Sequence, residues 1–285
     1  MQGAGFTILC ALCPVPCALN PIPVSGWVSG TLLGAMPNVQ TIGPSACADL
    51  INRSKRVVAL TGAGISTAAG IPDFRGPQGL YVTRRYDPEA TFDIAAFRRD
   101  PAPFYEFTRD FLGVIHNIEP TFSHQFLADL EVRGELTAVV TQNIDSLHQK
   151  AGSENVISVH GDYWTSHCLS CNAEFDLEYM EKAVLKDEVP HCACSGLIKP
   201  DVVFFGEPVH SLELAAVVVS DSDLLFVLGS SLNVYPAAFL PEQAGGDVVV
   251  VNKGEVGLPP GEGRWFADAD LDLFFGEVAG HLGDG

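Results

Sequence analysis

The feature that most constrains this chain is a glycine-rich turn between an apolar run and a stretch of small residues. The apolar run is Val57 to Leu60, and its length and β-branched side chains are typical of a buried parallel strand. Gly62 and Gly64 lack side chains, so backbone N–H groups there can close on a pyrophosphate at the start of a following helix. Thr67 stands where the usual dinucleotide fingerprint has its third glycine, so the turn alone also suits a purely structural role.

Three chemically distinct side chains follow the turn: Asp73, Phe74 and Arg75. A dehydrogenase that uses NAD for hydride transfer has no need of an acid, an aromatic ring and a guanidinium at this place. The stretch therefore predicts a nucleotide site with further chemistry beside it.

Charge and length narrow the class of protein. The formal net charge of -19 makes nucleic acid and anionic membrane surfaces poor partners, whereas a lysine-rich protein segment is a good one. The 285 residues can bury one substantial core, or form one large and one small lobe. Residues 1–35 contain no charged side chain and four prolines, so they resemble neither a signal peptide nor a membrane span. We expect them to be a disordered extension or a misassigned start.

The remaining chain predicts an α/β fold, because apolar strand runs alternate with helical patterns. Ser45 is expected to cap a short helix over residues 46–53, and the aromatic-rich segment 76–120 is expected to form a helical module beside the turn. The other expected strands are Leu136–Thr141, Val156–Val159, Leu224–Leu228 and Val248–Val251, and the expected helices include Phe122–Arg133 and His210–Ser220.

Polar side chains follow two of these strands. Gln142, Asn143 and Asp145 come directly after one strand, and His160 ends the next. Ligands of doubly wound sheets bind at the carboxyl ends of strands, so these side chains should share a crevice with the glycine turn. A lone histidine is more often structural, but one placed here could act as a general base on a ribose hydroxyl.

Four of the eight cysteines lie in two close pairs, Cys168 with Cys171 and Cys192 with Cys194. Four thiolates in this arrangement favour tetrahedral zinc, and four protein ligands leave no open position for catalysis. We therefore expect one structural zinc ion, a small module over residues 163–197, and a reducing compartment such as the cytoplasm.

Taken in order, these motifs resemble the sirtuin (Sir2) family of NAD-dependent protein deacylases. The motifs are Gly-Ala-Gly-Ile-Ser with Ile-Pro-Asp-Phe-Arg, Thr-Gln-Asn-Ile-Asp, His-Gly, the paired cysteines, Pro-Asp-Val-Val-Phe-Phe-Gly-Glu and Gly-Ser-Ser-Leu. The resemblance covers roughly residues 45–270. It implies a Rossmann-like parallel sheet with a smaller lobe made of the helical and zinc modules, within a catalytic domain spanning 45–285.

The resemblance also implies the site residues. The cofactor contacts would be Gly62, Ala63, Gly64, Asp73, Phe74, Arg75, Gln142, Asn143, Asp145, Gly229, Ser230, Ser231, Asn252, Lys253 and Ala269. The substrate backbone would pair as a strand with Val203, Phe204, Phe205, Gly206 and Glu207 and with Asn233 and Val234.

The implied reaction removes an acetyl group from a protein lysine and yields nicotinamide and O-acetyl-ADP-ribose. Asn143 and Asp145 would hold the ribose while nicotinamide leaves, and His160 would then act as the general base. Other readings are a mono-ADP-ribosyltransferase or a long-chain deacylase on the same site, a non-catalytic acyl-lysine reader, a zinc-stapled scaffold and a hydride-transfer dehydrogenase.

The acyl preference follows from a second resemblance. Sirtuins that prefer acidic acyl chains resemble one another in a Tyr-x-x-Arg pair, and Thr108 and Phe111 stand at these two positions here. Arg109 is rotated about 200° from position 111 on a helix, so it should face elsewhere. We expect acetyl-lysine to be preferred over succinyl-lysine.

Overall fold

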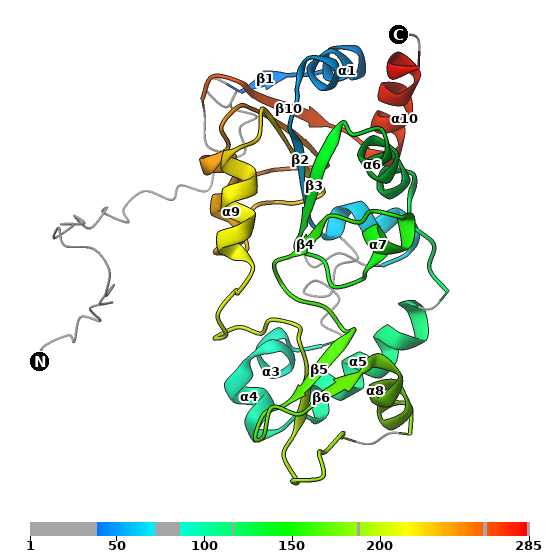
Figure 1. Ribbon diagram of the computed structural model, residues 1–285, viewed down its shortest axis with the longest axis vertical. Helices are drawn as coiled ribbons and strands as arrows, with labels where there is room; N and C mark the ends of the chain where they lie inside the picture. Colours follow the sequence, from blue (N-terminus) through cyan, green and yellow to red (C-terminus); the bar gives the residue numbers. More distant parts are fainter. Residues whose placement is uncertain (1–38, 72–85, 116, 187–188, 259–260, 284–285) are drawn as a thin grey trace, which may run out of the picture. The chain divides into compact units, whose positions relative to one another are not determined.

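The computed structural model describes residues 39–71, 86–115, 117–186, 189–258 and 261–283. The chain divides into two units, Met1–Ala35 and Met36–Gly285, and every described element lies in the second (Figure 1). Within the described residues, no helix is both long and apolar enough to cross a membrane.

The larger lobe is built on one sheet of seven strands in the order β1-β10-β9-β8-β2-β3-β4. Every neighbouring pair runs parallel, and the central strands have every residue buried, as expected for a sheet covered on both faces. In chain order the strands are β1 (Gln40–Thr41), β2 (Val57–Thr61), β3 (Leu136–Thr141), β4 (Val156–Ser158), β8 (Leu224–Leu228), β9 (Asp247–Asn252) and β10 (Arg264–Asp268).

Helices cover both faces of this sheet (Figure 1). One core contains side chains of α1 (Pro44–Arg53), α6 (Phe122–Val132) and α10 (Leu271–Leu282). The other contains side chains of α9 (Leu212–Ser220) and the 3-10 helix η2 (Ala237–Gln243). The short helix α7 (Leu147–Ala151) packs beside α6.

The smaller lobe has its own core of aromatic rings. Helices α3 (Pro88–Phe92), α4 (Ile94–Arg99) and α5 (Ala102–Ile115) supply Phe92, Phe97 and Phe104, which meet edge to face at centroid distances of 5.5–6.4 Å. A three-stranded antiparallel sheet, in the order β6-β5-β7, lies beside α8 (Leu177–Val184). Its strands are β5 (Thr165–Cys168), β6 (Glu174–Asp176) and β7 (Ile198–Pro200).

The predicted fold class is confirmed, and one local detail of the prediction is wrong. Ser45 does not cap α1: the helix begins at Pro44 after Gly43, because proline is already fixed in a helical φ and has no N–H to satisfy. The helix expected after the glycine turn is present and is a 3-10 helix, η1 (Ala63–Ala69).

Candidate active site

A cavity of about 810 Å³ opens at the carboxyl ends of strands β2, β3, β4, β8 and β9 and extends to the smaller lobe. This is the edge of a doubly wound sheet at which ligands bind, and the volume is in the upper part of the range for ligand pockets. Its wall combines polar strand ends from the large lobe with aromatic side chains of α3 and α5.

The glycine turn forms part of this wall, and its glycines are required by a close approach of two strand ends. A Cβ on Gly62 would lie 2.8 Å from the carbonyl oxygen of Gly229, and a Cβ on Gly64 would lie 2.7 Å from the Gly229 Cα. Gly229 itself has φ of 60°, and a Cβ there would lie 2.4 Å from the Ile65 nitrogen. Any side chain at these three positions would force the two strand ends apart.

Two N–H groups of this turn are already bonded inside the chain. Gly62 N–H donates to the Leu228 carbonyl at 2.9 Å and Gly64 N–H to the Gly229 carbonyl at 2.8 Å. Gly62 and Gly64 thus permit the close contact of the two strand ends, and the expected contact of this turn with a pyrophosphate stays a prediction. Both residues nevertheless line the cavity.

Three polar side chains meet at the floor of the cavity. The Ser66 hydroxyl donates to Asp145 Oδ2 at 2.6 Å, and Asn143 Nδ2 donates to Ser66 Oγ at 3.2 Å and to the Gly62 carbonyl at 3.1 Å. Burial raises the pKa of Asp145, while the Ser66 hydroxyl and the Leu147 N–H, which bond to its carboxylate, act in the opposite direction. Asn143 and Asp145 are thus held in fixed orientations by a buried serine.

His160 faces the same cavity with its tautomer defined by one hydrogen bond. Its Nδ1 lies 2.9 Å from the backbone carbonyl of Gln142. A carbonyl only accepts, so Nδ1 carries the proton and Nε2 keeps its lone pair. Burial lowers the pKa of His160, and the bond to Gln142 opposes this only in part. A neutral imidazole with an unprotonated Nε2 can act as a general base.

A buried polar network lies beneath these strand ends. Thr61 Oγ1 lies 2.9 Å from Thr141 Oγ1 and 2.9 Å from His148 Nε2, and Thr141 Oγ1 accepts the Asn143 N–H at 3.0 Å. The His148 ring lies 4.6 Å from that of His124, whose Nδ1 accepts the Thr121 N–H. Burial lowers the pKa of both rings, that of His124 to about 4.

The buried histidines predict a loss of stability in mild acid. An unfolded histidine binds its proton near the ordinary value of 6.5, whereas folded His124 binds one only near pH 4. Between these values the unfolded state holds more protons, so the free energy of unfolding should fall by about 1.4 kcal/mol per pH unit for this residue as pH decreases. Urea denaturation at several pH values gives the free energy of unfolding as a function of pH. This free energy should change less steeply with pH in His124→Gln than in the control His191→Gln, which changes an exposed histidine. Equal slopes would contradict the prediction.

Polar side chains at the far strand ends form another part of the site. Gln142 Nε2 donates to Ser230 Oγ at 3.1 Å, and Lys253 Nζ pairs with Asp270 Oδ2 at 2.7 Å. Asn252 also lines the cavity, through a side chain that donates to the Lys253 carbonyl. Ala269 is not among the lining residues; it packs against the core, and its adenine contact stays a prediction.

The segment expected to bind substrate has most of its N–H groups in use. Val203 N–H donates to the His160 carbonyl, Phe204 N–H to Glu207 Oε2, and Phe205 N–H to the Phe92 carbonyl. Gly206 is the one residue of this segment whose N–H bonds to no other described residue. The carbonyls of Phe204 and Phe205 are also in use, since they accept the N–H groups of Glu207 and Ile94, and the pairing of a peptide strand with this segment stays a prediction. Phe204 is 2% exposed and Phe205 51%, so only the second ring is open to a bound peptide.

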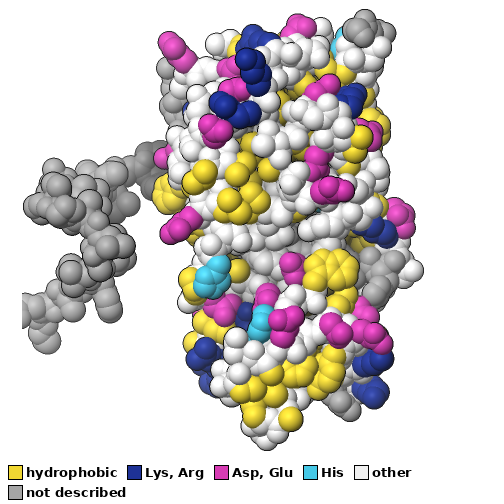
Figure 2. Space-filling model, viewed as in Figure 1, with side chains coloured by type: hydrophobic (Ala, Val, Ile, Leu, Met, Phe, Trp, Pro, Cys, Tyr) yellow, Lys and Arg dark blue, Asp and Glu magenta, His cyan; other side chains and the backbone are white. Residues whose placement is uncertain are grey.

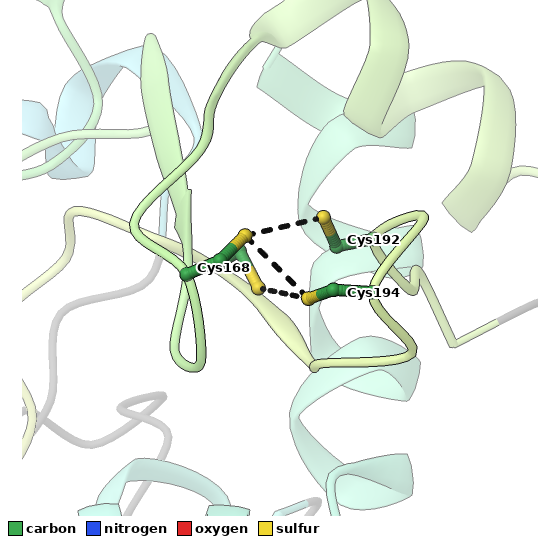
Figure 3. A group of neighbouring side chains, drawn as sticks. Cys168, Cys192 and Cys194 are labelled. Atoms are coloured by element: carbon green, nitrogen blue, oxygen red, sulfur yellow. Dashed lines mark hydrogen bonds between the residues drawn. The ribbon is translucent and has the colours of Figure 1, made fainter.

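The four cysteines of the smaller lobe lie close together. Their sulfur atoms all lie within 4.8 Å of one another, and three of the pairs are separated by 3.5 to 3.6 Å (Figure 3). A zinc ion with four Zn–S bonds of about 2.3 Å requires sulfur separations of about 3.8 Å, so Cys168, Cys171, Cys192 and Cys194 are compatible with one structural zinc ion. Gly196 is also required, because a Cβ there would lie 2.6 Å from Cys168 Sγ.

Most of the predicted site residues come together in this cavity. Asp73, Phe74 and Arg75 lie outside the described residues, so their role stays a prediction. The predicted residues that line the cavity are Gly62, Ala63, Gly64, Gln142, Asn143, Asp145, His160, Val203, Phe204, Phe205, Gly206, Glu207, Gly229, Ser230, Ser231, Asn233, Val234, Asn252 and Lys253.

Sequence reasoning missed residues whose role depends on distant partners. Ser66 was read only as a small residue, although it holds both Asn143 and Asp145. Asp110 and Tyr235 line the cavity as well and were assigned no role there. The only local signal for Ser66 was a hydroxyl side chain two residues after Gly64.

The sequence matches relatives and solved structures along most of its length. A protein of Sulfolobus acidocaldarius named NAD-dependent protein deacetylase is 42% identical over 243 residues, covering 82% of this chain and 93% of that protein. A Thermotoga maritima protein of the same name is 46% identical, covering 73% and 85%. A solved structure of a Sir2 protein with a p53 peptide and NAD+ is 40% identical with a TM-score of 0.77, covering 86% of this chain and all of that one.

A second structure, of a Sir2 protein with a deacetylated p53 peptide and 3'-O-acetyl ADP ribose, has a TM-score of 0.78 at 40% identity, covering 85% of this chain and 99% of that one. The model of the Sir2 family matches residues 62–236, the part of the chain that contributes most of the cavity and all four clustered cysteines. The chain therefore belongs to the Sir2 family.

Proposed function

We propose that this protein removes acetyl groups from protein lysines in an NAD-dependent reaction that yields nicotinamide and O-acetyl-ADP-ribose. The observation that carries the proposal is the convergence of Asn143, Asp145 and His160 on one cavity, with the His160 Nε2 left unprotonated. The names of the relatives and the bound molecules in the similar structures support the same reaction.

The cavity fits NAD in size and in the polarity of its wall. The edge of the sheet where dinucleotides bind is lined by Gly62, Gly64 and Gly229 and by the serines Ser230 and Ser231. The same edge extends past the end of β8 to Asn252 at the end of β9. When bound, NAD would supply an electrophilic ribose carbon with nicotinamide as its leaving group.

The residues of this chain would then act as follows. Asn143 and Asp145, fixed by Ser66, would orient the ribose and exclude other conformations of it. The His160 Nε2 would accept a proton from a ribose hydroxyl, and its Nδ1–H would stay on the Gln142 carbonyl throughout.

The partner would be an acetylated lysine in a protein or peptide. The net charge of -19 favours a segment with further lysines or arginines, and acidic side chains are spread over the face shown in Figure 2.

We further propose one catalytic domain over residues 45–285 with modules at 76–120 and 163–197. Four thiols grouped for metal binding favour a reducing compartment, and we place the protein in the cytoplasm.

Incubation with NAD and an acetyl-lysine peptide tests the reaction directly. Mass analysis should show loss of the acetyl group from the peptide together with free nicotinamide and O-acetyl-ADP-ribose. Transfer of ADP-ribose to protein without loss of the acetyl group would favour the ADP-ribosyltransferase alternative. Peptide binding without any product would favour a reader.

The acyl preference is expected to disfavour acidic chains. Phe107, Phe111 and Ile118 give one part of the cavity an apolar wall, and Asp110 adds a carboxylate there. Thr108 lines no part of the cavity, since its hydroxyl is buried and donates to the Phe104 carbonyl at 2.9 Å. A succinyl carboxylate would be desolvated beside these rings, which is a cost that an apolar acyl chain does not have.

We therefore expect kcat/KM for a succinyl-lysine peptide to be at least about tenfold below that for the acetyl peptide, the change that about 1.4 kcal/mol produces. A pentanoyl peptide of the same sequence is the control, because it matches the succinyl chain in length and lacks the charge. Comparable efficiency on succinyl and acetyl peptides would refute the expectation, and would point to an arginine reaching the chain from outside the described residues.

A further inference from the structure

Lys199 is a buried cation that the proposed reaction does not use. It lies on β7 with its side chain 6% exposed, and its ammonium lies 4.1 Å from the centroid of the Phe204 ring. Its Nζ reaches the carbonyls of Pro200 at 3.1 Å and Val202 at 2.6 Å and the Oε2 of Glu207 at 2.9 Å. An ammonium has three donors, and here they are directed at the last residue of the strand and at the segment that follows it.

Glu207, at the other end of the same segment, bonds back to Phe204 as well as to Lys199. Its Oε2 also accepts the Phe204 N–H at 2.9 Å, and its own N–H donates to the Phe204 carbonyl at 3.0 Å. Residues 200–207 are therefore folded around one ion pair. This segment lines the cavity from Val202 to Glu207 and bonds to the His160 carbonyl through the Val203 N–H.

The position of Lys199 is set by the sheet that carries the cysteines. Strand β7 pairs with β5 so that Lys199 lies opposite His167 and Ile198 opposite Cys168. The ammonium thus connects the strand beside the cysteine cluster to the wall of the cavity.

The energetics favour a role in shape over a role in stability. Burial lowers the pKa of Lys199, and Glu207 beside it opposes that change only in part. A buried ion pair costs two desolvations and is often no more stable than an apolar pair of the same size. What an apolar pair cannot do is hold the carbonyls of Pro200 and Val202 and the N–H of Phe204 in one arrangement.

We propose that Lys199, through Glu207, is a positioning residue that shapes the acyl-lysine side of the cavity. The inference rests on the proposed deacetylase function. Lys199 does not touch the substrate; it fixes the backbone of residues 200–207, against which the peptide and the acyl chain would lie. Its loss should weaken use of the peptide and leave the NAD side of the cavity intact.

The test compares Lys199→Met, the double variant Lys199→Met with Glu207→Gln, and the control Lys182→Met. Lys182 also pairs with a glutamate in the smaller lobe, but its side chain is 69% exposed. Steady-state kinetics would give KM for the acetyl peptide, calorimetry would give Kd for NAD, and a thermal melt would give Tm.

We expect Lys199→Met to raise KM for the peptide at least about tenfold, as misplaced substrate contacts do, while Kd for NAD changes less than about twofold. Tm should also fall, because Glu207, whose side chain is 23% exposed, is left as a partly buried carboxylate without its cation. In the double variant, the neutral amide can still accept the Phe204 N–H, so Tm should recover while KM stays raised. Lys182→Met should change none of the three.

Each contrary outcome has a distinct meaning. An unchanged KM in Lys199→Met, an equal loss of NAD binding, or recovery of both Tm and KM in the double variant would overturn the positioning role alone. Absence of any turnover by the wild-type protein would reject the proposed function, and the role of Lys199 with it.

Discussion

Replacing His160 with alanine should lower the rate of deacetylation by about 10² to 10⁴-fold, the range that a positioned general base contributes, while NAD still binds. The imidazole carries its proton on Nδ1, bonded to the Gln142 carbonyl, and burial lowers its pKa so that Nε2 is free at neutral pH. The residues expected to contact the cofactor approach the cavity from other strand ends, so removing the ring should leave that surface in place.

Turnover by mass analysis and NAD binding by calorimetry separate these two effects. His281→Ala, which changes an exposed histidine on α10, is the control and should behave as wild type. Near-normal turnover by a folded His160→Ala protein would remove this residue from the mechanism. Loss of NAD binding would instead assign it a part in building the cavity.

Loss of zinc should lower stability and activity together. Cys171→Ser removes one of four ligands, and metal binding is coupled to folding in small metal modules. A destabilisation of about 3 kcal/mol, at the upper end of ordinary single-site effects, corresponds to a fall in Tm of about 6–12 °C for a chain of this size. Activity should fall together with Tm, because β7 pairs with the strand that contains Cys168 and leads directly into residues 202–207, which line the cavity.

Metal analysis and thermal melts of the purified protein check this expectation. Wild type should contain one zinc ion per chain, and Cys171→Ser much less. Cys47→Ala is the control: this buried cysteine packs in the core of the large lobe, so the change should lower Tm without lowering the zinc content. An unchanged melting curve after complete removal of the metal would show that the cysteines do not support the fold through zinc.

The parts of the fold that could be predicted are those with a strong local pattern. Leu136–Thr141 and Leu224–Leu228 are strands with the predicted bounds, because fully buried parallel strands read as short apolar runs. β10 was missed: Arg264, Trp265 and Phe266 are only half-buried, so the run lacks that apolar pattern. β1 has two residues, too few for any period to be seen.

The site shows the same division. The sequence predicted one crevice for Asn143, Asp145 and His160, because each of these residues comes after a parallel strand. The reason for the glycines could not be predicted, because the atom that excludes a side chain at Gly62 belongs to Gly229, far along the chain. Contacts of this kind arise from the order of strands in the sheet, and nothing in the local sequence records that order.

The order of strands in the large sheet also bears on how the chain is made. The first long strand, β2, lies between β3 and β8, and Val57 pairs with Leu224 on one side and Leu136 on the other. During synthesis from the N-terminus, one edge of β2 therefore waits unpaired until most of the protein has left the ribosome. The Gly62 turn is incomplete for the same period, since Gly229 is made last of its partners. We expect nascent chains that end before β8 to need a chaperone on that exposed edge and to acquire the cofactor site only after release.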